Sequence, residues 1–152
     1  MNTEKDIIIV GAGPIGIAMA LECQKRQWNY VVIEKGTLTN SLFNYPKNMT
    51  FFSTSEKLEI DNIPFISNNP KPNRDEALEY YRRVAISNKL HINLYETVEA
   101  IKKVEDGFAV STNKSHYTSK YVVISTGFYD IPNVMNVPGE QLPKVTHYYK
   151  EA

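Results

Sequence analysis

The length, composition and charge of the chain limit the classes of protein to which it can belong. Its 152 residues, 42% of them hydrophobic, are enough to bury one core, so a single domain is expected. Seventeen basic and seventeen acidic residues cancel, which leaves no overall field to attract nucleic acid or an anionic membrane. The longest aliphatic runs are far below the roughly 18 residues of a membrane-spanning helix, and residues 1–5 do not resemble a signal peptide. We therefore expect a cytoplasmic protein with no nucleic-acid partner and no membrane partner.

Cysteine and histidine usage restrict the chemistry further. Cys23 is the only cysteine, which excludes an internal disulfide, a pair of redox cysteines and a cysteine-rich zinc site within these residues. The histidines at positions 91, 116 and 147 do not have the spacing of metal ligands. No metal is expected, and any redox chemistry requires an organic cofactor.

The first 36 residues predict one βαβ unit. Residues 6–10 form a short, β-branched apolar run, which is typical of a strand buried in a parallel sheet. Residues 14–27 carry apolar and small side chains at helical spacing, and the proline that begins this segment suits a first helical turn. Residues 30–34 then predict a second buried strand.

The remaining residues combine one long irregular segment with further strands. Residues 37–73 are rich in Asn, Ser, Pro and aromatics, and a loop of this length is usually functional or disordered. A helix is predicted over about residues 74–88, with a capping box at its start. The chain then predicts a third parallel strand at 91–94, a three-stranded antiparallel meander over 97–119 and a return to the parallel sheet at 121–125.

The sequence GAGPIG over residues 11–16 directly follows the first predicted strand and opens the first predicted helix. In this context Gly11 makes a tight turn, Gly13 lets the backbone approach a pyrophosphate and Gly16 permits close packing of helix on strand. The N–H groups and the dipole of the helix N-terminus can hold the anion. Glu34 follows Gly16 by 18 residues, at the end of the second strand, where a carboxylate can accept hydrogen bonds from ribose hydroxyls. This combination, in which a strand, the glycines, a helix and an acid follow one another at the expected spacing, favours a dinucleotide-binding site over an ordinary glycine turn.

The predicted meander distinguishes FAD from NAD, which share an ADP moiety. A simple NAD domain continues with alternating strands and helices, whereas here a meander precedes a strand that ends in Thr126 and Gly127. This order resembles the FAD domain of the glutathione reductase superfamily. The predicted fold class is accordingly α/β, a Rossmann-like FAD/NAD(P)-binding three-layer domain with a parallel sheet and an antiparallel β-meander crossover. The resemblance implies that Thr126 and Gly127 touch the cofactor and that the Val98 backbone meets the adenine, although an ordinary strand-ending turn is the alternative for the Thr-Gly pair.

Further sequence blocks sharpen this resemblance: SLFNYP at 41–46, TFFSTSEKL at 50–58, STGFYD at 125–130, and the stretch from NVPGE at 136–140 through HYYKE at 147–151. Over essentially the whole chain they look similar to the YpdA-type bacillithiol disulfide reductases, relatives of thioredoxin reductase. That family implies FAD, NADPH and a small-molecule disulfide substrate, with the flavin ring beside the first of these blocks; it implies no catalytic residue here. The expected cofactor-binding residues are Gly11, Gly13, Pro14, Ile15, Gly16, Glu34, Lys35, Ser41, Tyr45, Val98, Thr126 and Gly127.

One position departs from that family. Its members often carry a cysteine directly before the third glycine, where this chain has Ile15. Thiol chemistry cannot be transferred to an isoleucine, so either the substrate differs or another group completes the reaction. Cys23 lies two turns further along the predicted helix and is expected to be a structural, half-buried residue rather than a redox group.

Several interpretations stay open at this level. Phe51 and Phe52 either cover the end of the sheet or approach the cofactor, and His147 is expected at the surface. A flavin monooxygenase is the alternative enzyme, because such proteins share the glycine motif, an aromatic loop and the strand-ending Thr-Gly. Since no second GxGxxG follows, we expect residues 1–152 to be the N-terminal FAD-binding part of a longer protein, without the nicotinamide-binding domain and the C-terminal return segment. Alone, the chain would then be a non-catalytic dinucleotide-binding module. Both a monomer and a homo-oligomer are compatible with the sequence.

Overall fold

One mixed sheet organises the computed structural model, which describes residues 4–149. The sheet has six strands in the order β3-β2-β1-β6-β5-β4. The last two residues of the predicted closing block, 150 and 151, lie outside the described residues. Along the chain the elements are β1 (Glu4–Val10), α1 (Pro14–Lys25), β2 (Tyr30–Ile33), α2 (Asn40–Phe43), α3 (Ser55–Leu58), α4 (Arg74–Ser87), β3 (Ile92–Asn93), β4 (Val98–Val104), β5 (Gly107–Thr112) and β6 (His116–Ile124).

The parallel half of the sheet is centred on β1, which pairs with β2 on one side and with β6 on the other. The apolar runs of β1 and β2 are buried on both faces, as expected for strands covered from both sides, whereas Tyr121 and Ile124 of β6 are exposed. Ile7, Ile9 and Val32 pack on the helical side, whereas Ile8 and Val31 pack on the opposite side. The predicted βαβ unit is confirmed.

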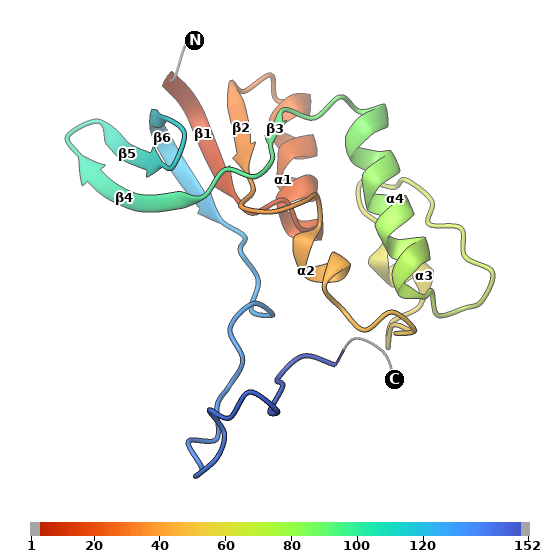
Figure 1. Cartoon of the computed structure of the whole chain (residues 1–152). Helices are drawn as coiled ribbons and strands as arrows, with labels where there is room; N and C mark the ends of the chain where they lie inside the picture. The colour runs from red at the N-terminus through yellow and green to blue at the C-terminus, as the bar shows by residue number, and fades with distance from the viewer. Residues whose placement is uncertain (1–3, 150–152) are drawn as a thin grey trace.

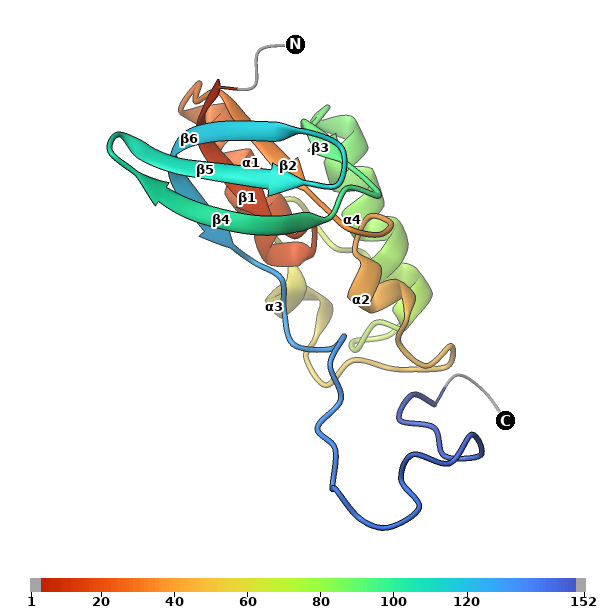
Figure 2. The same ribbon diagram turned by 60° about the vertical axis from the view of Figure 1, so that its left-hand side comes forward.

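The meander lies on the face of the parallel sheet away from α1 and α4, so the chain forms three layers (Figures 1 and 2). Val110 on β5 contributes to the same core cluster as Ile8 and Val31, and Val98 and Tyr117 pack against this cluster. The fold class predicted from the sequence, α/β with a parallel sheet and an antiparallel crossover, is thereby confirmed.

The boundary between the meander and the returning strand is different from the prediction. The sequence suggested that the meander ends near residue 119 and that a separate strand begins at 121. Instead, β6 runs without interruption from His116 to Ile124: its first part pairs antiparallel with β5 and its later part parallel with β1. No glycine or proline breaks the chain at this point, so a single strand passes from one layer to the other.

The segment between β2 and α4 is folded against α4. Two aromatic rings of α4 reach this segment, because the Tyr80 hydroxyl donates to the Ile63 carbonyl (2.8 Å) and the Tyr81 hydroxyl donates to the Leu58 carbonyl (2.9 Å). Phe65 stacks on Tyr80 with ring centroids 4.3 Å apart. The predicted capping box is confirmed at the start of α4. The long loop is therefore an ordered wall of the molecule, not a disordered insertion.

The chain after β6 extends away from the three layers and contains no helix or strand up to residue 149 (Figure 1). The buried Glu140 carboxylate organises this segment by accepting the N–H groups of Met135 (2.9 Å) and Asn136 (2.6 Å). These backbone hydrogen bonds lower the pKa of Glu140. Within residues 4–149, none of the helices combines the length and the apolar character that a membrane crossing requires.

Cys23 is more deeply buried than the sequence suggested. The expectation was a half-buried residue, but its side chain is fully covered in the cluster between α1 and the sheet. Burial raises the pKa of the Cys23 thiol. The helix phase explains the difference, because Cys23 shares the inward face of α1 with Ala20.

This burial generates a testable prediction for the folded chain. Iodoacetamide reacts with thiolates, so Cys23 should resist alkylation under native conditions and should be labelled only when the chain unfolds. Mass spectrometry of the chain, with and without urea, measures the labelled fraction. Equal labelling rates in the native and the urea-unfolded chain would contradict the packing of Cys23 described above.

Candidate dinucleotide-binding site

A cavity of about 560 Å³ opens at the carboxyl ends of β1, β2 and β6. Ligands of open α/β sheets bind in crevices at this end of the strands. The cavity lining includes every cofactor-binding residue predicted from the sequence except Gly16. The tertiary structure thus brings together five separate parts of the chain that carry these residues: the glycine loop, the end of β2, the segment from α2 to Tyr45, the start of β4 and the turn after β6.

The three glycines of the motif have different surroundings. A Cβ atom on Gly16 would lie 1.9 Å from the Gly11 carbonyl oxygen, and a Cβ on Gly11, whose φ is +103°, would lie 2.5 Å from the Ser125 carbonyl oxygen. A Cβ on Gly13 would meet nothing within 4 Å. Gly11 and Gly16 are therefore required by packing, whereas Gly13 leaves open space above the N-terminus of α1. Gly16 belongs to the architecture of the site and not to its lining.

The N-terminus of α1 is suited to an anion. Gly13 is its N-cap residue, and no side chain caps this end of the helix. The first N–H groups of a helix have no partner within the helix, and the helix dipole places partial positive charge there. A pyrophosphate could accept hydrogen bonds at this point, as the sequence predicted.

Glu34 joins the end of β2 to the glycine loop. Its Oε2 atom accepts the N–H of Ala12 (2.8 Å) and its Oε1 atom accepts the N–H of Gly36 (2.9 Å). The residue is buried, with 6% of its surface exposed. A carboxylate has about four acceptor positions, so it can hold the loop and still accept from hydroxyl groups of a ligand.

Ser125 is a part of this site that the sequence-based list omitted. Its hydroxyl lies 2.9 Å from the carbonyl oxygens of both Val10 and Gly11, and its N–H donates to the Val10 carbonyl (2.8 Å). These bonds hold the turn after β6 against the glycine loop. The signal was present in the STGFYD block, but only the Thr-Gly pair of that block was selected.

An aromatic group forms another wall of the cavity. Tyr45 meets Tyr129 edge to face, with centroids 4.6 Å apart, and the Tyr129 hydroxyl donates to the Asn44 carbonyl (3.1 Å). Burial raises the pKa of Tyr45. Phe51 lines the cavity and also packs against the core, whereas Phe52 is 92% exposed and does neither. Phe51 thus lies between the core and the cavity, and its approach to a cofactor stays a prediction, whereas Phe52 lies at neither place.

Two other side chains define the remaining rim. Lys35 forms an ion pair with Asp130, 2.5 Å away, which links the end of β2 to the segment after β6. Ile15 is 70% exposed and presents an apolar surface to the cavity. His147, expected at the surface, lies 3.8 Å from the Glu140 carboxylate and is outside this lining. Lining residues that the sequence analysis did not select are Val10, Asn40, Leu42, Phe51, Leu58, Tyr81, Thr97, Ile124, Ser125, Phe128, Tyr129 and Asp130.

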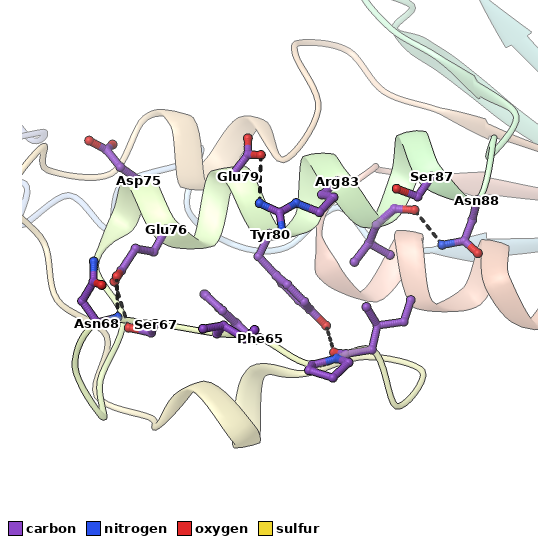
Figure 3. Close-up of a pocket in the computed structure, with 14 residues that line it drawn as sticks. Phe65, Ser67, Asn68, Asp75, Glu76, Glu79, Tyr80, Arg83, Ser87 and Asn88 are labelled. Atoms are coloured by element: carbon purple, nitrogen blue, oxygen red, sulfur yellow. Dashed lines mark hydrogen bonds and ion pairs between the residues drawn. The ribbon is translucent and has the colours of Figure 1, made fainter.

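A second hollow of about 470 Å³ lies between α4 and residues 63–68 (Figure 3). Its polar groups are already engaged within the chain: Glu76 accepts from Ser67 and the Asn68 N–H, and Glu79 pairs with Arg83. None of the predicted site residues lines it. The cavity above the glycine loop is therefore the better candidate site.

Comparison with known proteins agrees with this geometry. Residues 8–152 match the family model described as pyridine nucleotide-disulphide oxidoreductase. Bacilliredoxin reductase Bdr of Bacillus subtilis (strain 168) is 46% identical over 149 residues, which are 97% of this chain and 46% of that protein. The structure of Bacillithiol Disulfide Reductase Bdr (YpdA) from Bacillus cereus superposes with a TM-score of 0.94 at 48% identity, covering 97% of this chain and 47% of that one.

A flavin-containing monooxygenase from Stenotrophomonas maltophilia is a more distant neighbour. It superposes with a TM-score of 0.76 at 19% identity, covering 84% of this chain and 39% of that one. At this identity the likeness shows a shared fold and no more. The chain spans about half the length of the Bdr proteins that it matches. By its match over residues 8–152 and by its identity to Bdr, the chain belongs to the pyridine nucleotide-disulphide oxidoreductase family.

Proposed function

We propose that the chain is the FAD-binding part of an NADPH-dependent flavoprotein oxidoreductase that reduces low-molecular-weight thiol disulfides, with bacillithiol disulfide as the leading substrate. The observation that carries the proposal is the cavity at the glycine loop, in which Gly13 leaves open space beside the N-terminus of α1 and Glu34 forms part of the lining. The similarity to Bdr proteins, one of which is described as a bacillithiol disulfide reductase, supports the choice of a disulfide as substrate. The monooxygenase alternative has only the shared fold in its favour.

The residues of the cavity fit the parts of FAD. The N–H groups at the start of α1 hold the pyrophosphate, and Glu34 accepts hydrogen bonds from the ribose of the adenosine. The backbone at Val98 would face the adenine, and Ser41, Tyr45 and the turn at Thr126–Gly127, which also line the cavity, would contact the flavin half. The cavity volume lies in the range of small-molecule and cofactor sites, roughly 300–1,000 Å³. Held by these residues, FAD would supply two-electron transfer between a nicotinamide and the disulfide.

Among the residues that the structure describes, no cysteine lines this cavity. Ile15 occupies an exposed position at the start of α1, and Cys23, about two turns further along, is fully covered between the helix and the sheet. Electron transfer to the disulfide therefore uses the flavin itself or a group outside these residues. A low-molecular-weight disulfide reduced with NADPH belongs to the chemistry of the cytoplasm, which is the compartment we propose.

The glycine geometry generates the first prediction for this function. Gly13→Val should leave the fold intact, because its Cβ meets no atom within 4 Å, but the side chain would fill the space proposed for the pyrophosphate. We expect circular dichroism and the thermal midpoint to stay close to those of the unchanged chain, and affinity for FAD and ADP to fall by about tenfold or more. Titration calorimetry measures the affinity.

Gly16→Val is the matched control for this experiment. Its Cβ would lie 1.9 Å from a backbone oxygen, so the substitution should destabilise the chain itself. Retention of full FAD affinity in Gly13→Val would show that the pyrophosphate does not bind above this glycine.

A second prediction concerns catalysis. The 152-residue chain should bind ADP or FAD weakly and should oxidise NADPH no faster than free flavin does, because no second glycine motif is present. A protein that carries this chain together with the remaining half found in Bdr should be yellow as purified and should oxidise NADPH when a thiol disulfide is supplied. NADPH absorbance and flavin content measure both. Turnover by the 152 residues alone would refute the non-catalytic module, and NADPH oxidation that consumes oxygen without disulfide reduction would favour a monooxygenase.

A further inference from the structure

Glu96 is a buried carboxylate for which the sequence motifs provide no role. It lies in the turn between β3 and β4 with 4% of its surface exposed. Its Oε1 atom accepts from the hydroxyls of Thr112 (2.7 Å) and Tyr117 (2.9 Å), and its Oε2 atom accepts from the Asn93 amide (3.0 Å). These donors come from three different strands, so the carboxylate ties the turn to both the meander and the parallel sheet.

The backbone of the same residue is bonded to the proposed ribose-binding residue. The Glu96 N–H donates to the Glu34 carbonyl (2.9 Å), and the Glu34 N–H donates to the Asn93 carbonyl (2.9 Å). The two buried acids therefore sit on adjacent, hydrogen-bonded segments. Any movement of the turn at Glu96 would be transmitted to the end of β2.

The two residues that follow Glu96 line the cavity. Thr97 is held on both sides, because its N–H donates to the Asn113 side chain (2.9 Å) and its carbonyl accepts the Asn113 N–H (3.1 Å). Val98 begins β4 and lines the cavity beside Thr97. The position of this short edge is therefore determined by the hydrogen bonds of residues 96 and 97.

The turn requires such a restraint. Tyr95 has a φ of +55°, in the left-handed region that side chains other than Gly seldom adopt. A buried polar network with every member bonded fixes one geometry, whereas apolar contacts of the same size would tolerate several. The Glu96 network thus supplies the directional bonds that hold an unfavourable backbone conformation next to the cavity.

We propose that Glu96 is a positioning residue that fixes the Thr97–Val98 backbone as the adenine-recognising edge of the site and so sets its preference for adenine nucleotides. The inference rests on the proposed function, since it assumes that the cavity holds the adenosine half of FAD. Glu96 does not line the cavity and acts through Thr97 and Val98.

The test compares ADP with inosine 5′-diphosphate, which differs from ADP only in the base. In titration calorimetry the unchanged chain should prefer ADP. Glu96→Gln places an amide donor opposite one of the three donors that the carboxylate now accepts, so the Thr97–Val98 backbone should shift. We therefore expect the affinity for ADP to fall by about tenfold, while the affinity for inosine diphosphate changes little. Glu99→Gln is the matched control: it is the same chemical change on exposed β4 and should leave both affinities unchanged.

Tyr117→Phe provides a second variant that keeps the ring in the core and removes one donor to Glu96. It should reduce the preference for ADP over inosine diphosphate by a smaller factor than Glu96→Gln does. If Glu96→Gln does not fold, this variant tests the role of Glu96. Three results would each overturn the role of Glu96. The folded variants could lose affinity for both nucleotides equally, they could keep the ratio of ADP to inosine diphosphate affinity of the original chain, or the original chain could show no preference for ADP. Failure of the unchanged chain to bind either nucleotide would instead refute the proposed function.

Discussion

The contact of three backbone segments at the glycine loop is the constraint on which the rest of the structure depends. The end of β1, the start of α1 and the turn after β6 approach so closely that a single Cβ on Gly11 or Gly16 would overlap a carbonyl oxygen. Ser125 closes this junction with hydrogen bonds to the carbonyls of Val10 and Gly11. Because no bulky side chain fills this junction, Gly13 and the N-terminus of α1 remain open to the cavity.

Two buried carboxylates extend this junction to the other layers. Glu34 links the glycine loop to the end of β2, and Glu96 links the end of β2 to the meander. Buried acids are costly unless their oxygens are bonded, and here each oxygen accepts at least one hydrogen bond. Because a bonded buried acid adds little net stability, positioning of the cavity edge is the gain that we propose for retaining them.

Much of this arrangement could be predicted from local sequence patterns. The apolar runs at 6–10 and 30–34, the glycine motif between them and the capping box at Asn73 depend on residues close in the chain, so periodicity and spacing identify them. The resemblance of the aromatic block to a known family identified Ser41 and Tyr45, and the resemblance of the strand order to an FAD domain identified Val98, as parts of the cavity lining. The roles of these residues toward FAD stay predictions.

Only the tertiary structure decided which distant residues meet. The STGFYD block points to the neighbourhood of Ser125, but only the tertiary structure shows that its hydroxyl bonds the glycine loop 114 residues earlier. Likewise, the burial of Glu96 and Cys23 follows from the layers packed around them, and a polar or half-buried position was the natural expectation from composition. The sequence by itself determined the elements and the dinucleotide motif, because local backbone preferences specify them. Packing across the sheet determined the single continuous β6, the wall made by residues 37–73 and the network behind the cavity, because these depend on contacts between residues far apart in the chain.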